Sequence, residues 1–308
     1  MIDTIIIGAG PAGLTAAIYC LRSGLSTIVF DKNVYGGQVA LSNEIENYPT
    51  IKKISGYEFA TNLYEQVKEL GANVINDEIT KINNIQSRIK NVETKSNQYE
   101  TRTIIIASGA KRRKLNCPGE ENLIGKGVSY CATCDGSFFK DKVVCIVGGG
   151  NTALEDALYL SNICKTVYII HRRDTFSGEQ FLVNSVLEKN NVKVIYDSAV
   201  TKINGAKKVE SICIKNIQSN EITELYTNGI FIAIGLEPDT SMFKGIINMN
   251  KNNYIEANED CLTNIKGVFV AGDCRTKPLR QIVTATADGA VSAFQVSKYL
   301  NSFVKVNS

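Results

Sequence analysis

Two stretches of the chain repeat one pattern: an apolar run, a glycine-rich turn, a helix-forming stretch and a second apolar run. In the first stretch, DTIIIGAGPAG, Gly8, Gly10 and Gly13 lie between a predicted strand and a predicted helix. The first glycine permits a tight turn, the second lets a pyrophosphate approach the backbone, and the third lets helix and strand pack closely. The helix N-terminus then stabilises the phosphates. This context predicts a dinucleotide-binding βαβ unit.

The second stretch begins DKVVCIVGGGNTALEDALYL and has the same order of elements. Its predicted strand at 143–147 leads to Gly148 and Gly150, and Ala153 takes the third position of the motif. Alanine is an accepted residue at that position. The chain therefore carries two predicted dinucleotide-binding units.

The two units differ at the end of their second strand. Asp31 lies 23 positions after Gly8, and His171 lies 23 positions after Gly148, followed by Arg172 and Arg173. A carboxylate at this place suits a free ribose diol, whereas guanidinium groups suit a 2′-phosphate. The residues predict a flavin dinucleotide at the first site and NADPH at the second.

The rest of the chain predicts how the units are joined. Alternating short strands follow each unit and lead to apolar strands capped by small residues, at 103–111 and 229–238. After 245 a further strand at 268–271 and a helix at 282–300 have no glycine fingerprint of their own. We expect this last segment to complete the first domain. The predicted fold is α/β with two Rossmann-like dinucleotide-binding domains, the second inserted into the first: 1–114 with 246–308, and 115–245.

The segment VSYCATCDGSFF places Cys131 and Cys134 three positions apart, with Asp135 directly behind them. Such a pair binds a metal, links the fold or carries electrons. A structural zinc site needs four ligands from Cys and His. The chain has nine cysteines, this single CxxC pair and one histidine, so no metal is expected. The residues alone leave the structural and redox roles open.

Charge and hydropathy narrow the class of protein. With 34 basic and 31 acidic residues, the net charge of +3 favours neither nucleic acid nor a membrane surface as partner. No apolar run approaches the roughly 18 to 20 residues of a membrane span. The first strand begins without the basic segment of a secretory leader, so we expect a cytoplasmic protein. In a reducing compartment the cysteines are not expected to form a disulfide framework.

The order and spacing of the motifs resemble the low-molecular-weight bacterial thioredoxin reductases, essentially from end to end. The motifs that carry the resemblance are GAGPAG, YGGQ, EIENYP, CATCDG, GGGNTALEDALYLSN, HRRD and AGDCRTKPLRQIVTATADGA. The resemblance implies FAD in the first domain, NADPH in the second, thioredoxin as the protein partner, and a homodimer.

The resemblance also implies the residues of each site. Those expected at FAD are Gly8, Gly10, Pro11, Ala12, Gly13, Asp31, Lys32, Gly36, Gly37, Gln38, Asn47, Gly272, Asp273, Arg280, Gln281 and Ile282. Those expected at NADPH are Gly148, Gly150, Asn151, Thr152, His171, Arg172 and Arg173.

By the same resemblance, Cys131 and Cys134 form the redox-active disulfide. Cys134 faces the flavin, and Cys131 is the thiolate that attacks the disulfide of thioredoxin. Asp135 is the general acid that protonates the departing Cys134 thiolate. Two sulfurs in one disulfide accept two electrons, which matches the capacity of a reduced flavin.

One position departs from the family pattern. The family motif HRRxxxR has a third arginine, and here HRRDTFS places Ser177 at that position. The loss makes NADH or a protein donor more plausible, although NADPH is still favoured. A ferredoxin-dependent thioredoxin reductase and a flavin-dependent oxidase of small dithiols therefore remain alternatives, as does a non-catalytic redox sensor or metal-binding module.

Overall fold

The computed structural model describes residues 1–42 and 44–303. The chain forms two compact units: Met1–Lys111 with the segment from Glu237 onward, and Arg112–Leu236. It passes between them twice, and the crossing segments pair as strands β7 (Ala110–Arg112) and β16 (Leu236–Pro238). The unit boundaries fall inside this ribbon, whereas the sequence placed the joins after residues 114 and 245. The second boundary lies earlier than predicted because Phe243, which precedes the predicted join, packs in the core of the first unit.

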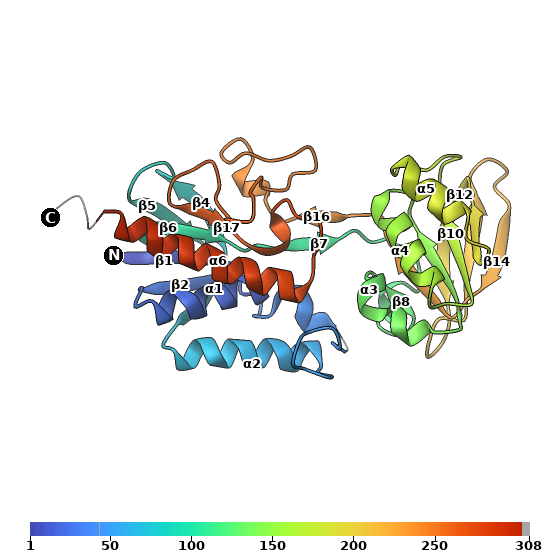
Figure 1. The fold of residues 1–308 in the computed structure, drawn as a ribbon, viewed down its shortest axis with the longest axis horizontal. Coiled ribbons are helices and arrows are strands. Elements are labelled where there is room, and N and C mark those ends of the chain that lie inside the picture. The colour runs from blue at the N-terminus through green and yellow to red at the C-terminus, as the bar shows by residue number, and fades with distance from the viewer. Residues whose placement is uncertain (43, 304–308) are drawn as a thin grey trace. The chain divides into compact units, whose positions relative to one another are not determined.

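The first unit is built on a mainly parallel sheet with strand order β3-β2-β1-β6-β5-β4, in which β17 also pairs with β6 (Figure 1). Its strands are β1 (Ile2–Ile7), β2 (Thr27–Asp31), β3 (Asn73–Asn76), β4 (Ile79–Asn83), β5 (Lys90–Thr94), β6 (Gln98–Ile106) and β17 (Val268–Val270). β1, β2, β3, β6 and β17 pair in parallel, and β4 and β5 pair antiparallel. Because β17 follows the inserted unit and returns to β6, the last segment completes this sheet. The predicted fold class is confirmed.

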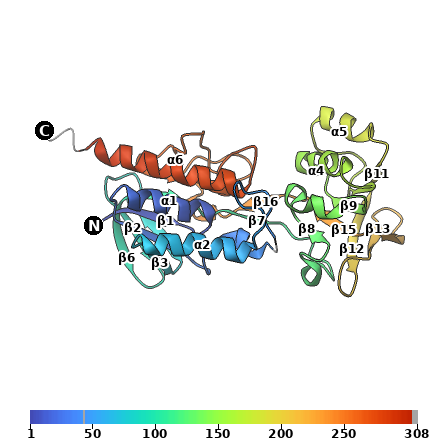
Figure 2. The same cartoon turned by 60° about the horizontal axis from the view of Figure 1, so that its bottom comes forward.

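Both faces of this sheet are buried. The helices α1 (Pro11–Arg22), α2 (Gly56–Glu69) and α6 (Ile282–Asn301) lie on one face, as Figure 2 shows, and pack against Ile6 and its neighbours. Ile5 points to the opposite face, where Phe243 and other residues of the C-terminal segment cover it. Successive strand residues point to opposite faces, so the unbroken apolar run at 4–7 is the pattern of a sheet buried on both sides.

The second unit repeats the parallel arrangement, with strand order β11-β10-β9-β15-β8. Its strands are β8 (Val128–Ser129), β9 (Val143–Val147), β10 (Thr166–Ile170), β11 (Val192–Ile195) and β15 (Gly229–Ile232). The helices are α3 (Ala132–Asp135), α4 (Asn151–Ser161) and α5 (Gln180–Leu187). Ile146 packs against Leu154 of α4 on one face of the sheet. On the other face, Cys145 packs against Ile212 of the antiparallel sheet β12 (Ser198–Asn204), β13 (Ser211–Asn216) and β14 (Ile222–Tyr226).

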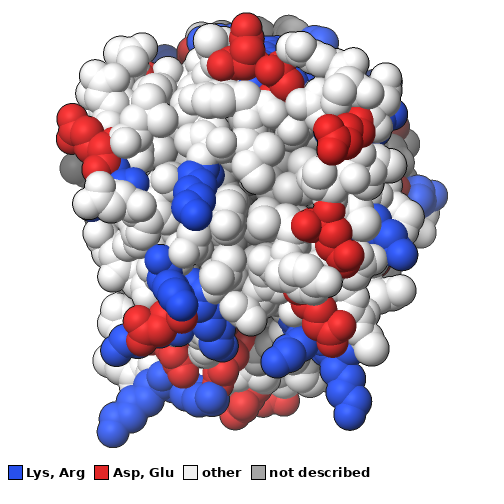
Figure 3. Space-filling model, turned by 90° about the vertical axis from the view of Figure 1, so that its right-hand side faces the viewer, with Lys and Arg blue, Asp and Glu red and all other residues white. Residues whose placement is uncertain are grey.

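On the face drawn in Figure 3, the charged side chains do not gather into a single patch of one sign. There, acidic and basic groups surround a broad area without charge. Within residues 1–42 and 44–303, no helix is long and apolar enough to cross a membrane.

Candidate functional site: two dinucleotide loops and a disulfide

The first glycine loop joins β1 to α1. Gly8 has a φ of +109°, and a Cβ at this position would lie 2.3 Å from the carbonyl oxygen of Ala107. A Cβ on Gly13 would lie 1.8 Å from the carbonyl oxygen of Gly8. Neither position has room for a side chain, and Gly8 also needs a left-handed conformation. The two glycines therefore let α1 start in direct contact with the loop and the sheet.

The first turn of α1 is arranged as an anion site. Gly10 is its N-cap, Pro11 follows, and no side chain caps the free N–H groups. A Cβ on Gly37 would lie 3.3 Å from the Cα of Gly10. The backbones of Gly10 and Gly37 therefore face each other with no side chain between them. The N–H of Gly36 donates to the carbonyl oxygen of Ala9 at 2.8 Å and so holds the Gly36–Gly37 backbone beside the loop. Bare backbone beside an uncapped helix start suits a pyrophosphate, so these residues fit a dinucleotide such as FAD.

Asp31 lies at the end of β2 and holds the glycine loop in place. Its Oδ2 accepts a hydrogen bond from the N–H of Ala9 at 2.7 Å, and its Oδ1 accepts one from Asn33 at 2.8 Å. An ionised carboxylate has about four lone-pair sites, so acceptor capacity remains for ribose hydroxyls. The neighbouring Lys32 instead pairs with Asp239 at 2.7 Å, and this hydrogen bond raises the pKa of Lys32.

The C-terminal segment brings a second group of predicted residues to the first unit. Gly272 and Asp273 begin the short helix η5 (Gly272–Cys274) directly after β17. The guanidinium of Arg280 lies 4.1 Å from the ring centroid of Tyr254, and its Nε lies 3.4 Å from the carbonyl oxygen of Asp273. These contacts fix Arg280 beside the turn that carries Asp273.

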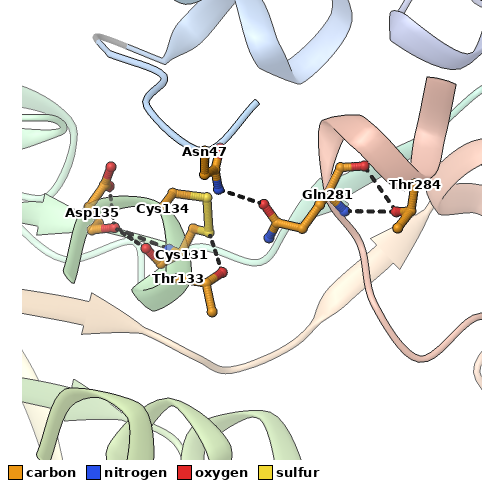
Figure 4. The surroundings of a disulfide bond; sticks show 8 residues. Asn47, Cys131, Thr133, Cys134, Asp135, Gln281 and Thr284 are labelled. Atoms are coloured by element: carbon orange, nitrogen blue, oxygen red, sulfur yellow. Dashed lines mark hydrogen bonds between the residues drawn. A yellow bond between two sulfur atoms is a disulfide. The ribbon is translucent and has the colours of Figure 1, made fainter. Parts of the chain in front are cut away.

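The start of α6 is linked to the N-terminal half of the unit. The amide of Asn47 donates to Oε1 of Gln281 at 3.1 Å, as Figure 4 shows. Gln281 is also the N-cap of α6, where it and Thr284 form a capping box. Ile282 begins the helix. Gln38 lies exposed in η1 (Gly37–Leu41). All residues predicted at FAD thus lie in the first unit.

The sequence reasoning missed a buried ion cluster in this unit. Asp288 of α6 accepts hydrogen bonds from Arg275 at 2.8 and 2.7 Å, from Lys277 at 2.8 Å and from the N–H of Gly272 at 2.9 Å. Burial raises the pKa of Asp288, but the hydrogen bonds from Arg275 and Lys277 outweigh it, and the pKa lies below its usual value. The cluster ties α6 to the segment 272–277, which contains Asp273. Its sequence signal was the motif RTKPLRQIVTATAD, in which the acid and both bases were present but unassigned.

The second glycine loop joins β9 to α4. Gly148 has a φ of +153°, and a Cβ there would lie 2.4 Å from the carbonyl oxygen of Ala233. Gly150 is the N-cap of α4, again without a side-chain cap. Asn151 exchanges two hydrogen bonds with Glu179 at 2.9 and 2.8 Å, and Thr152 is exposed. The local geometry of the first loop is therefore repeated here.

The end of β10 differs from the end of β2. The ring of His171 is only 7% exposed, and it fills the space where a Cβ on Gly149 would lie. Its Nε2 lies 2.9 Å from the carbonyl oxygen of Thr175. Burial, with the nearby charges of Arg173 and Arg172, lowers the pKa of His171. His171 thus supports the loop as a neutral ring.

The basic residues that follow His171 are accessible. Arg172 and Arg173 are exposed, so their guanidinium groups can meet a phosphate from solvent. Ser177 donates its hydroxyl to the carbonyl oxygen of Gly149 at 3.1 Å. The position of the family's third arginine is therefore used for a short bond to the glycine loop.

Cys131 and Cys134 form a disulfide in the second unit, with an S–S distance of 2.09 Å (Figure 4). Both residues are half-buried, and Cys131 is the N-cap of α3. Asp135, the last residue of α3, accepts a hydrogen bond from the hydroxyl of Ser129 at 2.5 Å. The sequence analysis did not select Ser129, although it lies just two positions before Cys131.

Six of the seven other cysteines are poorly suited to redox exchange. Burial raises the pKa of Cys20, Cys145 and Cys261 to about 12, and that of Cys117, Cys164 and Cys274 to about 11. Exchange requires a thiolate, which these groups do not form near neutral pH. Among the described residues, no group of three or more His, Cys, Asp or Glu side chains is placed to hold a metal ion. The Cys131–Cys134 pair is thus the candidate redox centre.

Comparison with known proteins agrees with this site. The family model described as pyridine nucleotide-disulphide oxidoreductase matches residues 2–289. A thioredoxin reductase from Bacillus subtilis is 40% identical over 299 residues, which are 97% of this chain and 94% of the relative. One from Peptoclostridium acidaminophilum is 40% identical over 307 residues, with 97% of each chain covered. The crystal structure of thioredoxin reductase from Streptococcus pyogenes has a TM-score of 0.93 at 41% identity, and covers 98% of this chain and 99% of its own.

The chain belongs to the pyridine nucleotide-disulphide oxidoreductase family. Within that family it is most plainly similar to the low-molecular-weight thioredoxin reductases, with which it shares identity over nearly its full length. The resemblance predicted from the motifs is confirmed.

Proposed function

We propose that this protein is a thioredoxin reductase that passes electrons from NADPH through FAD and the Cys131–Cys134 disulfide to the disulfide of thioredoxin. The observation that carries the proposal is this disulfide, formed in a chain whose two glycine loops both fit dinucleotides. Family membership, with relatives named thioredoxin reductase over nearly the whole chain, supports the same conclusion.

The unit formed by Met1–Lys111 and the segment from Glu237 onward is the proposed FAD domain. The backbone of Gly8, Gly10, Pro11, Ala12 and Gly13 holds the pyrophosphate at the start of α1, with Gly36 and Gly37 beside it. Asp31 accepts hydrogen bonds from the adenosine ribose. The remaining residues proposed at FAD are Lys32, Gln38, Asn47, Gly272, Asp273, Arg280, Gln281 and Ile282.

The unit Arg112–Leu236 is the proposed NADPH domain. Gly148, Gly150, Asn151 and Thr152 provide the phosphate loop at the start of α4, and His171 supports that loop. The exposed guanidinium groups of Arg172 and Arg173 bind the 2′-phosphate that distinguishes NADPH from NADH.

FAD, when bound, is the carrier that would take two electrons from NADPH and give them to the disulfide. As the Cys131–Cys134 bond breaks, Asp135 protonates the Cys134 thiolate. The Cys131 thiolate then attacks the disulfide of thioredoxin and forms a mixed disulfide. Cys134 loses its proton and attacks Cys131, which restores the starting disulfide and releases the thioredoxin dithiol.

The test uses the purified protein under argon. We expect a yellow protein that NADPH bleaches and thioredoxin restores to yellow. Cys131→Ser and Cys134→Ser should each retain FAD and lose thioredoxin reduction. Each variant has one sulfur left, which cannot form the disulfide that accepts two electrons. Near-normal turnover in either variant would contradict the disulfide assignment, and a colourless protein would contradict the flavin site.

Ser177 gives one specific reason to test a second electron donor. Its hydroxyl is bonded to Gly149, where the family pattern has a third phosphate-binding arginine. If reduced ferredoxin bleaches the protein and neither NADPH nor NADH does so, the protein is a ferredoxin-dependent thioredoxin reductase. Bleaching by neither donor, with oxidation of small dithiols by oxygen, would indicate the dithiol oxidase.

We also propose that the protein is a cytoplasmic homodimer that pairs through α6. Val283, Ala287 and Phe294 are exposed along one side of this helix, and Phe294 is 66% exposed. An apolar stripe on a long helix favours a protein partner over water. Sedimentation should give twice the monomer mass of 33.7 kDa, and Phe294→Glu should shift the equilibrium to the monomer. A monomeric wild type would overturn this part of the proposal.

A further inference from the structure

Ser129 lies at the end of β8, directly before the redox-active segment. Its main chain pairs in parallel with Phe231 of β15, and the residue is only 4% exposed. Side chains that follow the carboxyl end of a parallel strand commonly face a ligand or reaction site. The position of Ser129 is therefore fixed by the sheet rather than by the short helix α3.

The hydroxyl of Ser129 has three polar neighbours. Its Oγ lies 2.5 Å from Oδ2 of Asp135 and 3.3 Å from the carbonyl oxygen of Cys131. The N–H of Cys131 donates to the same oxygen at 3.1 Å. A serine hydroxyl has one proton and two lone pairs, so it can donate to only one of the two acceptors at a time.

These contacts are compatible with both protonation states of Asp135. When Asp135 is ionised, Ser129 donates its proton to the carboxylate. When Asp135 carries a proton, the carboxyl group donates to Oγ of Ser129, and the serine proton turns to the carbonyl oxygen of Cys131. The N–H of Cys131 keeps its acceptor in both states, so rotation of one O–H bond is sufficient.

We propose that Ser129 is a positioning residue for the disulfide chemistry, which holds Asp135 in place in both states and joins it to the backbone of Cys131. The inference rests on the proposed function, in which Asp135 supplies a proton to Cys134. FAD, when bound and reduced, would supply the two electrons that break the S–S bond. The proton of Asp135 then goes to the Cys134 thiolate, and Asp135 becomes a carboxylate. The serine proton then turns from the Cys131 carbonyl oxygen to that carboxylate.

A buried serine of purely structural role exists in the same unit and serves as a matched control. Ser198 is also 4% exposed, and its hydroxyl donates at 2.8 Å to the carbonyl oxygen of Tyr196. Ser198→Ala removes one buried hydroxyl and one hydrogen bond without touching the redox segment. It measures what the loss of a buried serine costs by itself.

The experiment compares Ser129→Ala, Ser129→Thr and Ser198→Ala as FAD-loaded proteins in stopped-flow absorbance under argon. Ser129→Ala should slow the transfer of electrons from reduced FAD to the disulfide about tenfold or more, because a hydrogen bond to a charged group is lost. Reduction of FAD by NADPH should stay within about twofold of wild type. Ser129→Thr, which keeps the hydroxyl, should restore most of the rate, and Ser198→Ala should not change it.

A second readout separates positioning from loss of structure. In deuterated water the disulfide step of Ser129→Ala should show a larger isotope effect than that of the wild type, because proton delivery becomes more limiting. Ser129→Gly, which also lacks the hydroxyl, provides the same comparison if the alanine variant does not fold.

Three results would overturn the inference: a wild-type rate without the hydroxyl, no recovery in Ser129→Thr, or equal slowing in Ser198→Ala. A wild-type protein that does not reduce thioredoxin at all would instead overturn the proposed function, so the two failures are distinguishable.

Discussion

The two glycine loops start alike and end differently. In each, a glycine with positive φ follows the first strand, and a helix without a side-chain cap begins three residues later. At the end of the second strand, Asp31 of the first unit accepts a hydrogen bond from its own loop at Ala9. In the second unit His171 packs its ring on Gly149 instead. The comparison teaches that the residue at this point supports the loop in both units, whereas the charge differs: a carboxylate lies there in the first unit, and the exposed Arg172 and Arg173 follow His171 in the second.

The third position of the motif differs as well. In the first unit Gly13 contacts the Gly8 backbone so closely that a Cβ would lie 1.8 Å from the carbonyl oxygen. In the second unit Ala153 occupies the matching place and is fully buried. Helix and loop are therefore closer in the first unit, where substitution should cost more.

The largest effect is expected for Gly13→Ala. The new Cβ would meet backbone rather than a movable side chain, so the loop and α1 must separate, at a cost of about 3 kcal/mol or more. FAD binding should be lost or weakened by more than about a hundredfold, as measured by flavin absorbance after purification and by denaturant unfolding.

The matched variant in the other loop is Ala153→Gly. It should cost only about 1 kcal/mol, chiefly through helix propensity, and leave FAD bound. Similar losses for both variants would contradict the difference in packing between the loops.

The next largest effect compares a buried acid in each unit. Asp288→Asn leaves Arg275 and Lys277 without their shared carboxylate, and should destabilise the first unit by about 3 kcal/mol. Glu120, buried in the second unit, accepts hydrogen bonds from the N–H groups of Leu115 and Asn116 and from the hydroxyl of Tyr130. Glu120→Gln leaves no cation without its partner. The free energy of unfolding in urea should therefore fall by a smaller amount, about 1 to 2 kcal/mol.

The Asp288 cluster should also give a pH signature. Because the native pKa of Asp288 lies below its unfolded value of about 4, its contribution to stability is present above that value and is lost as pH falls through the native pKa. Urea unfolding from pH 6 down to pH 3 should show a steeper loss for the wild type than for Asp288→Asn. Parallel curves would contradict the assignment.

Arg172→Ala tests the charge difference between the two ribose ends. The KM for NADPH should rise between about ten- and a hundredfold, because a contact to a charged phosphate is lost. NADH lacks this phosphate, so its kinetic parameters should stay nearly unchanged. The effect should shrink as salt is added, since exposed charges are screened. The measurement is steady-state kinetics with both nucleotides, and an unchanged KM for NADPH would contradict a contact between Arg172 and the phosphate.

The smallest effect sharpens the same comparison. Ser177→Arg should increase the preference for NADPH over NADH by about tenfold, by restoring a third cation near the phosphate. Ser177→Ala is the control, because it removes the bond from the hydroxyl to the Gly149 carbonyl oxygen without adding charge, and the backbone bond at 2.8 Å remains. If neither nucleotide reduces the flavin in any variant while ferredoxin does, the NADPH assignment falls and the disulfide assignment stands.

Much of this architecture was predictable because it is local. The glycine spacing and the apolar runs record steric limits that act within a few residues. They predicted a helix after each glycine loop, where α1 and α4 lie, and the helix predicted at 282–300 is α6. The last segment, without a glycine fingerprint of its own, predicted the insertion of one unit in the other. The Cys131–Cys134 pair was equally visible, because three positions separate its sulfurs.

What the fold alone decided depends on contacts between distant or ambiguous residues. Asn47 meets Gln281 across 234 positions, and no pattern within either segment identifies the other. Nothing in the sequence distinguished Asp288 from other acidic residues. The packing of α6 on α1 directs it at Arg275 and Gly272. Ser129 was an ordinary serine until β8 joined the sheet and placed its hydroxyl on Asp135. Periodicity and spacing in the sequence specify how each segment folds, whereas the partner of a polar side chain is decided only when burial removes water and leaves one neighbour within hydrogen-bond reach.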